Sequence, residues 1–196
     1  MLTCDSLQFK WRKSIMTQTK ITPRDLTVMA LFAALLCVSS YISIPLPFSA
    51  VSLTLQTLII NMIAILLPPK KAGLTVLVWM LLGLAGLPVF SGGMGGPAKL
   101  FGPTGGYIFG YLAAAILLSL LKGKKGNIAR ELVVIIAVGM PLIYLIGTPW
   151  MMAVTGIGWK AALLTGVVPF LPGDVAKCVG AVLICRPLKK ALWNKK

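Results

Sequence analysis

The 196-residue sequence contains no histidine and only four acidic residues, Asp5, Asp25, Glu131 and Asp174. Histidines and paired carboxylates provide most of the general acids and bases of enzymes. The sequence also has no recognisable nucleophile beside a base. These absences argue against an enzyme.

The cysteines lack the spacing of metal ligands, and three of the four lie in or beside apolar segments, where cysteine behaves as a small hydrophobic residue. We therefore expect no metal site, no disulfide framework and no cofactor. Residues 92–106 are rich in glycine, but the phosphate-binding pattern G-x-x-x-x-G-K-[ST] is absent, because Lys99 follows Ala98. Since no acid nearby can hold magnesium, we expect that this chain alone does not hydrolyse ATP.

Long apolar stretches without charge make up most of the sequence, and 58% of its residues are hydrophobic. No charge occurs in residues 26–69, 72–98, 100–121 or 132–159. A membrane-spanning helix needs roughly 20 apolar residues, so the first stretch is long enough for two, divided near Pro45 and Pro47. The net charge of +15 does not indicate nucleic-acid binding, because the basic residues lie between apolar runs and do not form a continuous basic surface on a soluble domain.

This pattern predicts an all-α integral membrane protein with six transmembrane helices in the cell membrane. The predicted spans are 26–44, 52–68, 72–88, 104–121, 131–150 and 165–186. With these spans, 16 of the 19 lysines and arginines fall on the side of the two termini, so the positive-inside rule predicts that both termini are cytoplasmic. Residues 20–190 would form the transmembrane domain. Residues 1–19 would be an upstream extension or a disordered tail, and residues 191–196 a basic cytoplasmic tail.

The three outer connections are nearly uncharged and rich in proline or glycine, and they cover residues 45–51, 89–103 and 151–164. We expect them to shape a site that opens to the outside. Glycine lets a backbone approach a ligand closely, which makes Gly93 a candidate beside Lys99 in the same connection. Gly105 and Gly106 would begin the fourth span, where free N–H groups can meet a ligand oxygen. Tight packing at the start of that helix is the alternative.

Asp174 and Lys177 are the most informative residues, because they are charged within an apolar span. A charge at membrane depth costs at least about 2.5 kcal/mol on insertion scales, so such residues are usually paired and functional. At i and i+3 they share one helix face. Pro169, Pro172 and Gly173 interrupt the helix just before Asp174. We therefore expect Asp174 and Lys177 to face a pocket; an ion pair that only fixes helix packing is the alternative.

Aromatic and small residues provide further candidates. The aromatic candidates lie toward the outer ends of the spans, where they fit either interfacial anchors or rings that stack on a planar ligand: Tyr41, Tyr107, Tyr144 and Trp150. Gln56 and Asn61 favour hydrogen bonds between helices over ligand contacts. The small residues of the first span permit close approach of another helix, either internal or in another subunit: Ala30, Ala33 and Ala34.

Three segments resemble the BioY family, the biotin-specific substrate-binding (S) components of energy-coupling factor (ECF) transporters. They are GGMGGPAKLFGPTGGY at 92–107, YLIGTPW at 144–150 and PFLPGDVAK at 169–177. The resemblance covers residues 20–190 and implies the six-helix S-component fold. It also implies an outward-facing biotin pocket, built from the ten candidates Tyr41, Gly93, Lys99, Gly105, Gly106, Tyr107, Tyr144, Trp150, Asp174 and Lys177.

The resemblance further implies partners and a mode of transport. The alanine face of the first span would dock on a transmembrane coupling subunit, which works with two cytoplasmic ATPases. Biotin would then be captured from outside with high affinity and released inside by a machine driven by ATP bound elsewhere. We also expect contact with membrane lipids and no binding of nucleic acid. The alternative is a stand-alone secondary transporter of a small carboxylate-bearing vitamin, with Asp174 as its coupling residue.

Overall fold

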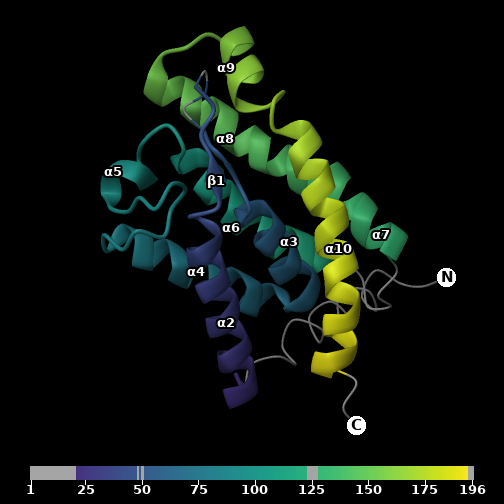
Figure 1. Ribbon diagram of the computed structural model, residues 1–196. Coiled ribbons are helices and arrows are strands. Elements are labelled where there is room, and N and C mark those ends of the chain that lie inside the picture. Colours follow the sequence, from purple (N-terminus) through teal and green to yellow (C-terminus); the bar gives the residue numbers. More distant parts are fainter. Residues whose placement is uncertain (1–20, 48, 50, 123–127, 194–196) are drawn as a thin grey trace, which may run out of the picture.

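The computed structural model describes residues 21–47, 49, 51–122 and 128–193. The chain is mostly helical, as predicted, and the described part adds one small antiparallel ribbon (Figure 1). In that ribbon β1 (Ser43–Ile44) pairs with β2 (Leu53–Thr54). The ribbon occupies the connection predicted at Pro45 and Pro47. The predicted extension at 1–19 and the last three residues of the predicted tail lie outside the described residues.

The first helix, α2 (Pro23–Ser39), begins with a capping box and is tied to α4. The hydroxyl of Thr22 accepts a hydrogen bond from the backbone N–H of Asp25 at 3.2 Å, and the Thr22 N–H donates to the Asp25 carboxylate at 3.0 Å. Lys71 Nζ lies 2.7 Å from the same carboxylate. The Asp25 carboxylate therefore caps the start of α2 and pairs with a lysine of α4.

The next two helices, α3 (Gln56–Leu66) and α4 (Pro69–Leu84), are separated by only two residues. Pro68 precedes α4 and Pro69 occupies its first turn, where the missing N–H is tolerated. Most of α3 is buried, and α10 and α6 both pack on it, so α3 is largely enclosed by its neighbours. It is shorter than the predicted span 52–68, because residues 53–54 pair with β1 instead.

A glycine-rich loop follows α4 and contains the single turn α5 (Pro97–Leu100). Gly92, Gly93 and Gly96 have φ values of +78°, +67° and +89°, which side-chain-bearing residues rarely adopt. The N–H of Gly92 donates to the carbonyl of Ser40 at 3.1 Å and ties this loop to the end of α2. The glycines thus make a compact loop over the β1–β2 end of the molecule. Helix α6 (Gly105–Leu121) follows the loop and matches the predicted fourth span within one residue.

One long helix of 28 residues runs from Ile128 to Thr155. It consists of α7 (Ile128–Val134), the π-helical segment η1 (Ile135–Gly139) and α8 (Met140–Thr155). Pro141 has no N–H for the carbonyl of residue 137, so the regular α-helical pattern is interrupted where η1 lies. Gly156, with a φ of +71°, ends α8. The helix extends beyond the predicted span 131–150 at both ends.

The last two helices, α9 (Trp159–Gly166) and α10 (Leu171–Trp193), are bent by 45° relative to each other. The break at residues 167–170 lies where the sequence predicted an interruption before Asp174. Helix α9 occupies part of the predicted outer connection 151–164. Helix α10 extends past the predicted span 165–186 and includes the first three residues of the predicted tail.

Helix lengths alone do not establish six spans. Within the described residues, the helix Ile128–Thr155 is long and apolar enough to cross a membrane, and the bent pair α9–α10 meets the test if it counts as one span. Helices α3 and α6 are apolar but shorter. The six-span count and the cytoplasmic termini therefore remain predictions.

The elements are arranged between two distinct ends (Figure 1). The β1–β2 ribbon, α5 and α9 lie at one end, called here the hairpin end; the start of α2 and the end of α10 lie at the other, called here the basic end. At the basic end, Lys122 donates to the carbonyls of Ala64 and Leu67, and Lys189 pairs with Glu131. The predicted outer connections therefore gather at the hairpin end, and Lys71, Lys122 and Lys189 lie at the opposite end.

Candidate functional site

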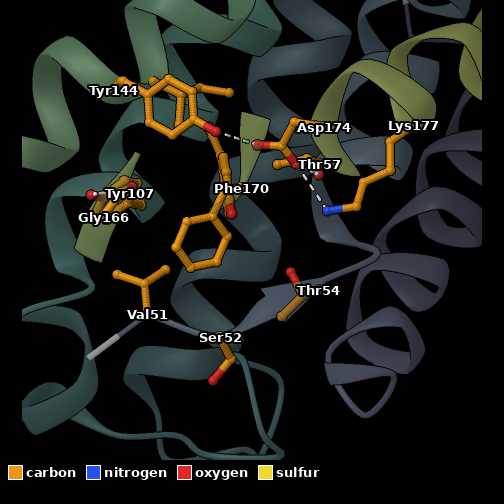
Figure 2. A pocket seen from close by; sticks show the side chains of 12 residues that line it. Val51, Ser52, Thr54, Thr57, Tyr107, Tyr144, Gly166, Phe170, Asp174 and Lys177 are labelled. Atoms are coloured by element: carbon orange, nitrogen blue, oxygen red, sulfur yellow. Dashed lines mark hydrogen bonds and ion pairs between the residues drawn. The ribbon is translucent and has the colours of Figure 1, made fainter. Parts of the chain in front are cut away.

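A pocket opens near the hairpin end, between the β1–β2 connection and helices α3, α6, α8 and α10 (Figure 2). The space not filled by atoms there is about 310 Å³, a figure that includes open solvent. The lining residues are Val51, Ser52, Thr54, Thr57, Tyr107, Tyr111, Ile143, Tyr144, Gly166, Phe170, Asp174 and Lys177.

Asp174 is the centre of the polar side of this pocket, and three side chains donate hydrogen bonds to its carboxylate. Tyr144 donates its hydroxyl to Oδ2 at 2.6 Å. Lys177 Nζ lies 2.9 Å from Oδ1, and the Thr57 hydroxyl donates to the same oxygen at 3.2 Å. Asp174 and Lys177 are each only 9% exposed. Since a buried charge is tolerated only when paired and hydrogen-bonded, this network supports an ionised carboxylate at the pocket wall.

The break between α9 and α10 sets the position of Asp174. The Asp174 N–H donates to the carbonyl of Phe170 at 2.8 Å, which places Asp174 in the first turn of α10. Pro172 is tolerated in that turn because its missing N–H has no helical partner there. Gly173 faces Leu53 of β2, and a β-carbon at this position would lie 3.2 Å from the leucine side chain. A small residue therefore lets the start of α10 approach the ribbon closely.

Tyrosines form another wall. The Tyr107 ring meets the Tyr144 ring edge-on, with 6.5 Å between ring centroids. The Tyr107 hydroxyl donates to the carbonyl of Gly166 at 3.1 Å, which ties α6 to the end of α9. A β-carbon on Gly147 would lie 2.5 Å from the Tyr107 ring, so only glycine leaves room for this tyrosine. The pocket thus combines an aromatic wall with one polar corner.

Four of the ten predicted site residues line this pocket: Asp174, Lys177, Tyr107 and Tyr144. Tyr41 and Gly93 lie beside each other outside it; a β-carbon on Gly93 would lie 3.0 Å from the Tyr41 ring, and Tyr41 is 61% exposed. Lys99 is half-buried in α5, and burial lowers the pKa of its ammonium group. The structure therefore does not bring these three residues to the pocket.

The other three predicted site residues, Gly105, Gly106 and Trp150, lie together where α6 meets α8. The Trp150 indole N–H donates to the carbonyl of Gly102 at 3.0 Å. A β-carbon on Gly105 would overlap the carbonyl of Leu100, and one on Gly106 would overlap the Trp150 side chain. This arrangement matches the alternative stated above, tight packing at the start of the helix, and none of the three lines the pocket.

Two polar residues of α3 contact neighbouring elements. Gln56 donates to the carbonyl of Val89 at 3.3 Å, and Asn61 donates to Cys178 Sγ of α10 at 3.5 Å. The Asn61 bond joins two helices, as the sequence favoured, whereas the Gln56 bond joins α3 to the loop after α4. In the first span Ala30 and Ala34 are exposed, whereas Ala33 is buried.

Several pocket residues were not predicted from the sequence. Thr57 lies four residues before Asn61 and therefore on the same side of α3, but nothing distinguishes its hydroxyl from others in apolar helices. Phe170 lies within the run PFLPGDVAK, so its position beside Asp174 was a signal that could have identified it. Val51, Ser52 and Thr54 come to the pocket through the β1–β2 ribbon, which the apolar pattern did not predict.

The arrangement suits a ligand with hydrogen-bonding groups at one end and an apolar body. The Asp174 carboxylate accepts N–H or O–H donors, Lys177 donates to an oxygen, and the tyrosine and phenylalanine rings pack on an apolar surface. Among the described residues no cluster of three or more metal-binding side chains occurs.

Comparisons with known proteins agree with one another. Residues 15–194 match the model of the BioY family. The chain is 37% identical to the probable biotin transporter BioY of Pyrococcus horikoshii and 39% identical to the biotin transporter BioY of Thermotoga maritima; each match covers 85% of this chain and 96% of the relative. Its structure is similar to the crystal structure of the S-component for biotin from an ECF-type ABC transporter, with a TM-score of 0.80, 30% identity and coverage of 87% of this chain and 95% of that chain.

Proposed function

The chain belongs to the BioY family, and from this membership we propose that it captures biotin with high affinity as the S component of an ATP-driven ECF importer. Its relatives are transport proteins and not enzymes, and the family and fold make it a membrane protein. The observation that carries the proposal is the pocket in which Asp174 accepts three hydrogen bonds beside an aromatic wall.

Biotin has the chemistry that this pocket suits. Its ureido ring offers two N–H donors and a carbonyl acceptor, whereas the sulfur-containing ring fused to it and the hydrocarbon chain are apolar. We assign the Asp174 carboxylate to a ureido N–H, and Lys177 to an oxygen of the ligand. Tyr107, Tyr144 and Phe170 would pack on the rings and the hydrocarbon chain. Gly93 and Lys99 remain candidates only for a more distant part of the ligand.

Titration of the detergent-purified protein with biotin in a calorimeter tests this proposal. We expect saturable, tight binding, because a largely buried polar corner and an aromatic wall fit one compact ligand. If the folded protein does not bind biotin, the assignment fails. A protein that binds biotin but takes it up with a proton gradient and without the ATPases would instead be the stand-alone transporter with Asp174 as coupling residue.

We also propose six membrane segments with both termini in the cytoplasm. They are α2, α3, α4, α6, the helix Ile128–Thr155 and the bent pair α9–α10, each with its flanking residues. The gathering of Lys71, Lys122 and Lys189 at the basic end supports this orientation. The exposed Ala30 and Ala34 of α2 are proposed to face the transmembrane coupling subunit, which acts with two ATPases.

Site-directed labelling tests the orientation with two matched lysine positions, both exposed. In a background without native cysteines, Lys160→Cys at the hairpin end should react with a membrane-impermeant maleimide in intact cells. Lys190→Cys at the basic end should react only after the cells are permeabilised. The opposite pattern would invert the topology, and reaction of both in intact cells would contradict a single membrane crossing by the bent pair α9–α10.

A further inference from the structure

Thr57 contacts Asp174 from α3, a helix that holds none of the ten predicted site residues. Its hydroxyl donates to Asp174 Oδ1 at 3.2 Å, across the interface between α3 and α10. Figure 2 shows Thr57 next to the point where Lys177 reaches the same carboxylate. The pocket carboxylate is therefore held from α3 as well as from α8 and α10.

The donors around Asp174 use most of its acceptor capacity. An ionised carboxylate has about four lone-pair positions. Within the described part of the chain, Lys177 and Thr57 share Oδ1, and Tyr144 takes one position on Oδ2. One position, on Oδ2, is left for a donor from a ligand. A carboxylate held by donors from three helices also cannot rotate freely about its side-chain bond.

We propose that Thr57 is a positioning residue for biotin recognition, which acts by sharing Oδ1 with Lys177 and so directing Oδ2 of Asp174 to a ligand N–H. This inference rests on the proposed function. Without the Thr57 hydroxyl, Oδ1 would have a free acceptor position, and the carboxylate could turn so that either oxygen meets Lys177 or the ligand. The loss would therefore appear in binding and in the hydrogen bonding of the carboxylate itself.

A second contact between the same two helices provides a matched control. One turn further along α3 and α10, Asn61 Nδ2 lies 3.5 Å from Cys178 Sγ, and neither residue lines the pocket. If Thr57 served only to pack α3 against α10, removal of the Asn61 contact would have a similar effect. If Thr57 acts through Asp174, only Thr57 affects the ligand.

The experiment compares Thr57→Val, which keeps the shape without the donor, with Thr57→Ser, which keeps the donor, and with Asn61→Leu. Calorimetric titration should show biotin binding weakened about tenfold or more in Thr57→Val, since hydrogen bonds to charged groups are among the stronger ones. Thr57→Ser and Asn61→Leu should stay close to the parent. Thr57→Ala serves in place of the valine variant if the latter does not fold, as judged by thermal unfolding.

Infrared spectroscopy of the ligand-free protein measures the hydrogen bonding of the carboxylate directly. A purely structural role of Thr57 would leave this signal unchanged. The carboxylate stretching band of Asp174, identified by its loss in Asp174→Asn, should shift in Thr57→Val and stay in place in Asn61→Leu. An unshifted band, or parent-like biotin affinity in Thr57→Val, would overturn the inference while leaving the proposed function intact. Failure of the parent to bind biotin would overturn both.

Discussion

Replacement of Asp174 by asparagine should weaken biotin binding by at least about 100-fold, because it removes a buried charge that accepts hydrogen bonds from three side chains. Tyr144, Thr57 and Lys177 all direct donors at the carboxylate. The amide of asparagine has one acceptor oxygen and one donor group. The Tyr144 or Thr57 hydroxyl would have to turn to accept from that donor group. Lys177 would lose its neutralising partner in a site where it is only 9% exposed.

Asp25→Asn is the matched control for this prediction. It makes the same chemical change at the basic end, where Asp25 pairs with Lys71 and caps α2. We expect calorimetric titration to give parent-like biotin affinity for this variant, with some loss of thermal stability. Equal affinity in Asp174→Asn and the parent would remove Asp174 from the binding site. Equal losses in the two variants would point to a general effect of lost charge on the fold.

Substitution of Gly106 by alanine should destabilise the fold by about 3 kcal/mol, at the upper end of the usual range for overpacking. The new β-carbon would overlap the β-carbon of Trp150 and lie 3.0 Å from the carbonyl of Ile146. These atoms belong to or adjoin the backbone of α8, so no rotation of a side chain can relieve the contact. Helices α6 and α8 would have to move apart at the interface that carries Tyr107 and Tyr144.

Gly158→Ala is the control, because Gly158 has an ordinary φ of −71° and no atom within 4 Å of the position of a new β-carbon. Thermal unfolding of the ligand-free proteins in one detergent should show a large decrease of the melting temperature for Gly106→Ala and little change for Gly158→Ala. If Gly106→Ala melts like the parent but binds biotin poorly, Gly106 contacts the ligand, as the sequence first suggested. That result would contradict the packing role.

The pocket residues that could be predicted are those of a type that is rare in membrane-spanning helices. Asp174 and Lys177 stand out because charges are rare in apolar spans. Of the residues expected to interrupt the helix, Pro169 lies in the break at residues 167–170, whereas Pro172 and Gly173 lie in the first turn of α10. Thr57 could not be identified, since a hydroxyl in an apolar helix does not have the free-energy cost of a charge and is common there.

The different roles of aromatic residues near helix ends were harder to predict. Tyr144 and Trp150 stand in the same run and both lie toward the outer end of a predicted span, so the pattern treats them alike. In the structure they lie on different sides of α8: Tyr144 meets Asp174, and Trp150 packs on Gly106. Only the packing of α6 against α8 decides between these roles. The β1–β2 ribbon was missed because its strands have two residues each, too few for a periodic signal.

The π-helical segment η1 has a consequence for comparison between relatives. The helix Ile128–Thr155 meets α10 on both sides of η1, through Glu131 with Lys189 and through Tyr144 with Asp174. A π-helical turn holds one more residue than the α-helical turn it replaces. A relative whose helix is regular throughout should therefore have one residue fewer between the positions of Glu131 and Tyr144. An alignment that keeps both contacts in register must open a one-residue gap there, and an ungapped alignment would turn one of the two side chains by about 100° away from α10.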